Sequence, residues 1–135
     1  MKVVLDTNVL VSGLLSPFSI PGEIIRLVAS GALALCYDAR ILSEYRNVLF
    51  RPKFSFDQIR VDDLLEQIKI YGYVTTGKLL IKRLPDPDDE PFLEVALGSE
   101  SQYLITENLK HYPVKKRLGI LVLSPRDFLE IYRKK

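Results

Sequence analysis

The amino-terminal stretch Lys2-Val3-Val4-Leu5-Asp6 decides the expected fold, because it is a short apolar run that ends in an acid. An apolar run without polar alternation is typical of a strand that is covered on both faces, as in a parallel sheet. Ligands of open α/β sheets bind beyond the carboxyl ends of such strands, which makes Asp6 a candidate functional residue. A helix cap or a turn would explain an aspartate here equally well, so both interpretations stand at this point.

The rest of the chain alternates between strand-like and helix-like segments. Further strands are predicted at residues 32–37, 103–106 and 120–123, and at an uncertain position between 73 and 84. Helices are predicted at residues 21–29, 39–50, 58–71 and 91–97 and from 125 onward, with Asp38, Asp57 and Ser124 as caps. This alternation predicts an α/β fold of three layers, α/β/α, with a central, mostly parallel sheet of about five strands. We expect one such domain to span residues 1–135.

Composition narrows the class of protein. The 135 residues are 47% hydrophobic with a net charge of +2, so a nucleic-acid partner would be held by a local patch and not by the overall field. The single cysteine, Cys36, and the single histidine, His111, exclude an internal disulfide and argue against a four-ligand zinc site. The early acid Asp6 argues against a signal peptide, and no apolar run approaches the ~20 residues that span a bilayer. We therefore expect a soluble cytoplasmic protein without membrane association.

The helix predicted at residues 39–50 carries an acid on its apolar side. Its apolar stripe consists of Ile41, Tyr45 and Val48. Glu44 follows Ile41 by three residues and therefore points toward the same face of the helix. A carboxylate there is unfavourable unless it is paired or bound to metal. The alternative is a glutamate at the edge of the stripe that reaches solvent or pairs with Arg40 or Arg51.

Four acids are crowded together directly before a predicted helix. They are Asp86, Asp88, Asp89 and Glu90. Negative charge is favoured at a helix amino terminus, which explains one or two of these acids. Four like charges repel one another, and a bound cation is a common remedy. Together with Asp6 and Glu44 they offer only oxygen ligands, which suit Mg²⁺ or Mn²⁺, so the residues point to metal-dependent phosphate chemistry.

Four short segments, in chain order, resemble the motifs of the PIN-domain family. They are Val3-Val4-Leu5-Asp6-Thr7-Asn8-Val9-Leu10, Leu42-Ser43-Glu44-Tyr45, Asp86-Pro87-Asp88-Asp89-Glu90-Pro91-Phe92-Leu93-Glu94-Val95-Ala96 and Leu104-Ile105-Thr106-Glu107-Asn108. The resemblance extends to residues 123–129 and so covers nearly the whole chain. It is strongest to the bacterial and archaeal PIN proteins that are described as toxins of toxin–antitoxin pairs. It implies a parallel sheet with helices on both sides, Mg²⁺ or Mn²⁺ as the cofactor, and hydrolysis of RNA.

The resemblance also implies roles for single residues. Asp6, Glu44 and Asp89 match the catalytic acids that bind the metal in the family. Thr7, Asn8 and Thr106 match polar positions that often orient the acids or water, and Asp86 and Asp88 are supporting polar residues beside Asp89. The implied partners are an RNA substrate, an antitoxin protein and a second copy of the chain in a homodimer. The leading hypothesis is therefore a metal-dependent endoribonuclease that acts as a toxin.

One position departs from the family pattern. Where the fourth segment usually carries an aspartate, this chain has Asn108, with Glu107 beside it. Both residues are candidates for a second metal position, so the number of metals stays open. The nearby cations are candidate contacts to RNA phosphates or part of a solvated loop: Lys110, Lys115, Lys116 and Arg117. His111 has no acid beside it in this loop, so we expect an unpaired surface residue.

Two other functions stay open. A haloacid-dehalogenase-like phosphatase would use Asp6 as a covalent nucleophile, but this chemistry usually needs a second aspartate two residues later, where this chain has Asn8. A PIN-like module that is weakly active or inactive, and that binds RNA or protein, is motivated by Asn108 in place of the usual acid.

Overall fold

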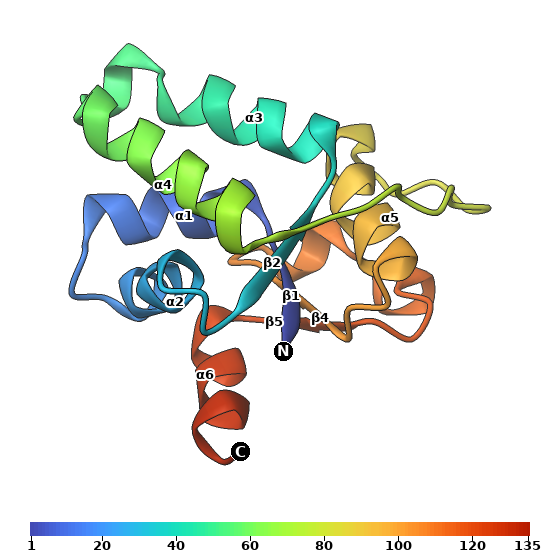
Figure 1. The fold of residues 1–135 in the computed structure, drawn as a ribbon. Helices are drawn as coiled ribbons and strands as arrows, with labels where there is room; N and C mark the ends of the chain where they lie inside the picture. The colour runs from blue at the N-terminus through green and yellow to red at the C-terminus, as the bar shows by residue number, and fades with distance from the viewer.

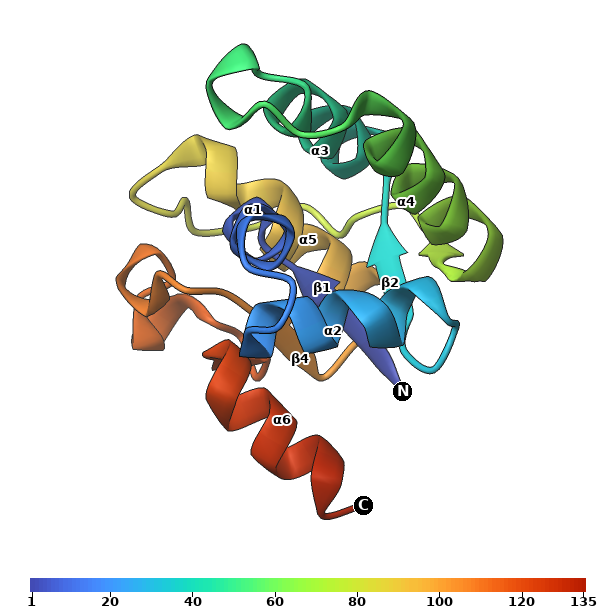
Figure 2. The same cartoon turned by 90° about the vertical axis from the view of Figure 1, so that its left-hand side faces the viewer.

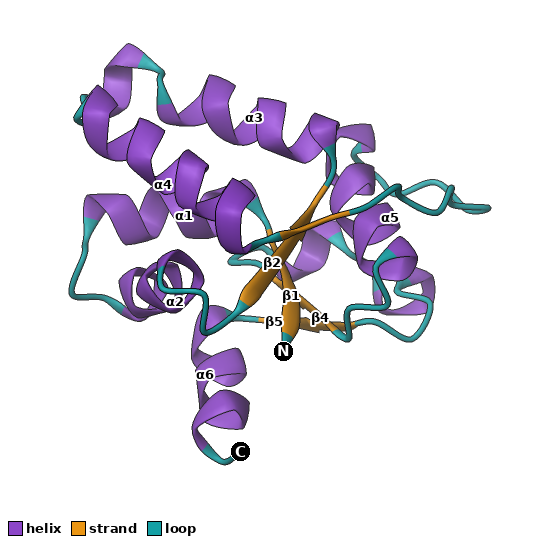
Figure 3. Ribbon diagram, in the orientation of Figure 1, coloured by secondary structure: helices purple, strands orange, loops and turns teal.

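Five strands form one sheet in which every neighbouring pair is parallel. The computed structural model describes all 135 residues of the chain. The strands are β1 (Lys2–Leu5), β2 (Ala34–Tyr37), β3 (Tyr73–Val74), β4 (Tyr103–Ile105) and β5 (Leu121–Leu123). They lie in the order β3-β2-β1-β4-β5, with β1 at the centre (Figure 3). The predicted α/β fold with about five strands is therefore confirmed, and the sheet is parallel throughout.

Six α-helices surround this sheet (Figure 1). They are α1 (Thr7–Leu15), α2 (Ile20–Ala29), α3 (Ala39–Leu49), α4 (Gln58–Tyr71), α5 (Glu90–Gly98) and α6 (Pro125–Arg133). Helix α5 packs against β1, β2 and β4, whereas α4 contacts β2 and α6 contacts β4 and β5. The connections from β1 to β2 and from β2 to β3 run toward one edge of the sheet, and the connection through α5 runs back toward the other. Right-handed crossovers therefore put α2 and α4 on the face opposite α5. Figure 2 shows α6 on the side of α2, which it contacts.

Three predicted caps are present and explain where their helices begin. The side chains of Asp38, Asp57 and Ser124 accept backbone hydrogen bonds at 3.0, 2.9 and 3.1 Å at the starts of α3, α4 and α6. Each bond satisfies an amide that has no partner within the helix. Because Asp38 directly follows β2, its cap starts α3 at the carboxyl edge of the sheet, where Figure 1 shows the helix lying.

Helix α1 was not predicted from the residue pattern. Its apolar residues do not gather on one face, and Val9 and Leu10 are fully buried. Gly13 lets α2 approach closely, because a Cβ at this position would lie 2.3 Å from the side chain of Ile25. None of the helices combines the length and the apolar character needed to span a membrane; α1 and α2 meet this criterion only when taken together, and a bend of 106° separates them.

The loop of residues 75–86 is fastened to α5 by two buried glutamates. Glu90 accepts the backbone N–H of Leu84 at 2.9 Å, and Glu94 accepts that of Leu80 at 3.2 Å. Buried carboxylates need such partners, which these two have. Glu90, one of the four clustered acids, is thus used to hold the loop, and the short 3₁₀ turn η2 (Pro87–Asp89) is fixed between loop and helix.

Candidate active site

Two adjacent strands bring polar residues to the same edge of the sheet. Leu5 in β1 pairs with Ile105 in β4, so the residues that follow them, Asp6 and Thr106, lie side by side. The Thr106 hydroxyl donates a hydrogen bond to Oδ2 of Asp6 at 3.0 Å. The backbone N–H of Asp6 donates to the carbonyl of Ile105 at 2.9 Å. Asp6 therefore lies at the carboxyl edge, where ligands of open α/β sheets bind.

The carboxylate of Asp6 is buried and firmly held, with 7% of the residue exposed. The hydroxyl of Tyr112 donates a second hydrogen bond to Oδ2 at 3.1 Å. Burial raises the pKa of Asp6 above its usual range, and the hydrogen bonds from Thr106, Tyr112 and backbone groups of Asn8 and Thr7 offset part of this rise. The position of the carboxylate is thus set by several donors before any ligand arrives.

Helix α3 brings a second acid to the same place. The Thr7 hydroxyl donates a hydrogen bond to Oε2 of Glu44. Next to it, the fully buried Tyr45 donates its hydroxyl to the carbonyl of Leu5 at 2.6 Å and so ties α3 to the end of β1. Burial raises the pKa of Glu44, the bond from Thr7 lowers it, and the charge of Asp6 raises it again. Asp6 is therefore close enough to disfavour the ionised form of Glu44.

Asp89 is the third acid at this edge, at the end of η2, and it is 8% exposed. Its Oδ2 is fully buried and has no hydrogen-bond donor. Nδ1 of His111 lies 3.0 Å from this oxygen, but the two atoms are not placed for a hydrogen bond. Burial raises the pKa of Asp89 from 3.8 to about 6, with Asp6 and Glu44 adding to the rise and His111 opposing it. A buried carboxylate oxygen without a donor is unfavourable on its own and suits a cation.

The three acids fit a divalent cation by their chemistry. All three offer carboxylate oxygens, the charge of Asp6 raises the pKa of both Glu44 and Asp89, and one oxygen of Asp89 has no donor. In the present side-chain positions no three His, Cys, Asp or Glu residues are close enough together to hold a metal ion. The site is thus a set of converging hard ligands and not a closed cage.

Comparison with known families identifies the family of the domain that carries these acids. The model of the PIN domain matches residues 2–110, a range that contains β1 to β4 and all three acids. The chain belongs to the PIN-domain family. The predicted resemblance is thereby confirmed. PIN domains are in general nucleases, a class of hydrolases, and they typically use divalent metal ions.

One relative matches this PIN domain over nearly its full length. It is the uncharacterized protein MJ1680 of Methanocaldococcus jannaschii, which is 24% identical over 144 residues. The match covers 99% of this chain and 93% of the relative. Its name carries no activity, so the similarity adds no information about substrate.

The polar residues around the acids form a connected network in the PIN domain. Asn8 donates to Oγ1 of Thr106 at 3.3 Å and accepts the backbone N–H of Glu107 at 3.2 Å. The backbone N–H of Asn108 donates to the same Oγ1 at 3.0 Å. The side chains of Glu107 and Asn108 are exposed, and that of Glu107 accepts a hydrogen bond from Ser12. Thr106 thus links β4, α1 and Asp6, whereas the two candidates for a second metal position lie outside the buried set.

The other predicted acids and the alternative partner of Glu44 have different contacts. Asp86 and Asp88 are exposed, and Asp86 accepts the backbone N–H of Asp88 at 2.9 Å, which caps η2. Arg40, one alternative partner of Glu44, pairs instead with Asp38 and Glu94 at 2.8 and 2.7 Å. Asp89 is therefore the one aspartate of its segment that is buried.

The four candidate RNA-binding cations separate into two pairs. Lys116 donates to the carbonyl of Arg83 at 2.8 Å, and Arg117 donates to that of Tyr112 at 2.7 Å. These two side chains hold the backbone of neighbouring segments. Lys110 and Lys115 are exposed, so they are the members of the group that face solvent.

Sequence reasoning missed Tyr112 and misjudged His111. Tyr112 is fully buried, and burial together with the charges of Asp6 and Asp89 raises its pKa far above the usual range, so it stays a neutral donor. The side chain of His111 is 43% exposed, as expected of a surface residue, but the expectation that it has no acid partner was wrong, because it lies against Asp89. An aromatic residue in a polar loop is the feature of the sequence that could have drawn attention to Tyr112. Only the fold shows which acid its hydroxyl contacts.

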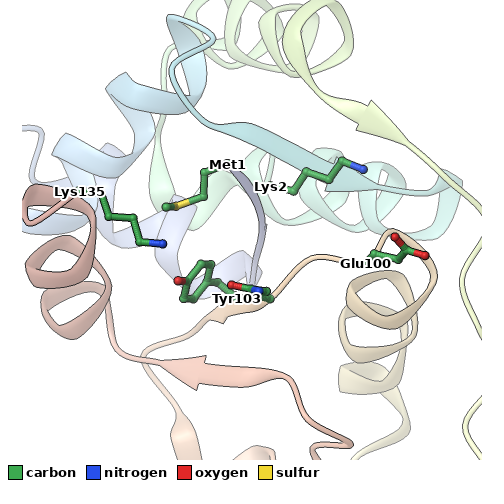
Figure 4. Close-up of a pocket in the computed structure, with 6 residues that line it drawn as sticks. Met1, Lys2, Glu100, Tyr103 and Lys135 are labelled. Atoms are coloured by element: carbon green, nitrogen blue, oxygen red, sulfur yellow. The ribbon is translucent and has the colours of Figure 1, made fainter.

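A pocket of about 350 Å³ opens at the opposite edge of the sheet. Figure 4 shows Met1, Lys2, Glu100, Tyr103 and Lys135 around it. These residues come from the amino-terminal ends of β1 and β4 and from the chain terminus, far from the carboxyl edge. The pocket contains exposed charges of both signs but no buried acid, so it offers no chemistry comparable to that around Asp6.

Proposed function

We propose that this PIN-domain protein is a metal-dependent endoribonuclease whose catalytic acids are Asp6, Glu44 and Asp89. The observation that carries the proposal is the donor-free, buried Oδ2 of Asp89 beside two other acids whose pKa values are raised. Buried carboxylates that repel one another are unfavourable without a cation, and hard oxygen ligands select Mg²⁺ or Mn²⁺. A bound ion of this kind activates water and stabilises negative charge on a phosphodiester.

Other residues of the chain orient the acids and can contact the RNA. Thr106 and Tyr112 hold Asp6 in one orientation through its Oδ2, so that loss of either donor would loosen the carboxylate. Thr7 does the same for Glu44 from the start of α1. Preorganised ligands of this kind act without reorganisation at the moment of reaction. An RNA strand reaching the acids would pass the exposed Lys110 and Lys115, which can contact phosphates.

Incubation with a mixed-sequence RNA tests the proposal. The wild type should cleave the RNA with Mn²⁺ and should fail to cleave it with EDTA. The Asp6→Asn variant should be inactive under the same conditions, whereas the Asp88→Asn variant, at an exposed neighbouring acid, should cleave. A circular RNA that becomes linear identifies the cut as internal. Cleavage by Asp6→Asn at the rate of the wild type would contradict the proposed site.

We further propose that the protein is the toxin of a toxin–antitoxin pair and that it forms a homodimer. The sequence resemblance to toxin components supports this assignment. Two apolar side chains on the loop of residues 75–86, Leu79 and Ile81, are 83% and 97% exposed, which is a surface that a partner protein can cover. Induced expression should arrest bacterial growth for the wild type and not for Asp6→Asn. Equal growth of the two strains would argue against a toxin.

A second candidate function is an RNA-binding module with little or no catalysis. It is favoured by one observation, namely that Asn108 is a neutral, exposed residue where the family pattern has an acid. RNA that is retained intact in the presence of Mn²⁺, by a protein that binds the metal, would support the module over the nuclease. The phosphatase is not favoured, because Asn8 is engaged with the backbone of Glu107 and carries no acidic proton.

A further inference from the structure

The one histidine of the chain lies against the acid that has the donor-free oxygen. Nδ1 of His111 is 3.0 Å from Oδ2 of Asp89, yet no hydrogen bond joins them. Two neighbouring ligands of an octahedral ion, each about 2.1 Å from it, are separated by about 3.0 Å. The spacing of the nitrogen and the oxygen therefore equals the spacing of adjacent donors on one ion.

The segment that carries His111 is held in place by several bonds. It is the turn η3 (Leu109–His111), in which the backbone N–H of His111 donates to the carbonyl of Asn108 at 3.1 Å. Arg117 clamps the turn by donating to the carbonyls of Tyr112 and Leu109 at 2.7 and 3.4 Å. The turn that follows Thr106 thus positions the imidazole of His111 beside Asp89. His111 lies three positions after Asn108, and position 108 is where the family pattern has another oxygen ligand.

We propose that His111 is a nitrogen ligand of the ion bound at Asp89 and that it makes the site prefer Mn²⁺ over Mg²⁺. The inference rests on the proposed metal site and adds a ligand and a selectivity to it. Mg²⁺ is held by oxygen ligands and dehydrates reluctantly, whereas imidazole suits transition metals better. A site with carboxylates alone would accept both ions, and one imidazole shifts it toward Mn²⁺. The other reading of the contact is a simple ion pair between a protonated His111 and Asp89.

Pulsed electron paramagnetic resonance of the Mn²⁺-loaded protein distinguishes these two arrangements without any measurement of activity. A coordinated imidazole gives a ¹⁴N modulation, and His111 is the only histidine, so the signal can be assigned without ambiguity. We expect the modulation in the wild type and in Lys110→Gln, an exposed neighbour, and its loss in His111→Gln. Bound Mn²⁺ without ¹⁴N modulation in the wild type would overturn the proposal and leave the ion pair.

Calorimetric titration gives the second readout. The His111→Gln variant should lose at least about tenfold in Mn²⁺ affinity with little change for Mg²⁺, so that the ratio of the two affinities falls. An unchanged ratio would overturn the selectivity. If the wild type binds neither ion, the proposed metal site fails together with the inference. If it binds Mn²⁺ through Asp6 but not through His111, only the inference fails.

Discussion

Replacing Asp89 by asparagine should stabilise the metal-free protein at neutral pH. Asp89 is 8% exposed, and burial, with the charge of Asp6 adding to it, raises its pKa from 3.8 to about 6. Above both pKa values the ionised carboxylate destabilises the folded state by at most about 3 kcal/mol, because each pKa unit corresponds to about 1.4 kcal/mol and solvent screening lowers the cost. Asparagine has the same shape without the charge, so the variant should recover most of this free energy.

The gain should depend on pH in a defined direction. The folded state holds the proton of Asp89 more tightly than the unfolded state does, so the stability due to the neutral carboxyl is fully present below about pH 4. This stability is lost as the pH rises through about 6. Wild type and Asp89→Asn should therefore have similar free energies of unfolding near pH 4, and the variant should be more stable by up to about 3 kcal/mol near pH 7.5.

Urea denaturation followed by circular dichroism, in the presence of a chelator, measures this difference. The control is Asp88→Asn at the exposed neighbouring acid, which should change the free energy of unfolding by less than about 0.5 kcal/mol. Mn²⁺ at about 100 times its dissociation constant should stabilise the wild type by about 2.7 kcal/mol and Asp89→Asn much less, which cancels the advantage of the variant. A variant that is less stable than the wild type near pH 7.5 without metal would refute the reasoning.

Three further substitutions follow from single contacts. Tyr112→Phe removes a donor from Asp6 and should raise the pKa of that acid further, which weakens Mn²⁺ binding about tenfold in a calorimetric titration. Tyr45→Phe leaves the last carbonyl of β1 without its donor and should lower the free energy of unfolding by about 1–2 kcal/mol, measured by denaturation. Glu94→Gln should weaken the hold on the loop, so that hydrogen exchange at the amide of Leu80 becomes faster while exchange in β1 is unchanged.

The strands and most helix starts could be predicted because their signals are local. A continuous apolar run marks β1 and β2, and the caps Asp38, Asp57 and Ser124 lie where the chain has a polar residue before a periodic segment. Helix α1 could not, because its apolar residues are spread around the helix and the 3.6-residue period that marks an amphipathic helix is weak. Its helical state is set by packing on α2, which a local pattern does not contain.

The site was predicted in part for the same reason. Asp6 and Glu44 could be predicted as site residues, because one follows a strand and the other lies on the apolar face of a helix. The roles of Tyr112 and His111 depend on contacts across 106 and 22 positions of the chain, with Asp6 and Asp89. No spacing rule links residues so distant, so only the folded chain shows that a loop tyrosine is a buried donor to an acid of the candidate site.

The most direct test of a shared metal site is a calorimetric titration of Mn²⁺ into the wild type and into single variants of its three acids. We predict a binding heat for the wild type and its loss in Asp6→Asn, in Glu44→Gln and in Asp89→Asn. The control variant Asp63→Asn, at an exposed acid of α4, should bind like the wild type. Absence of binding by the wild type, or binding by Asp6→Asn with unchanged affinity, would contradict the assignment of these carboxylates as one metal site.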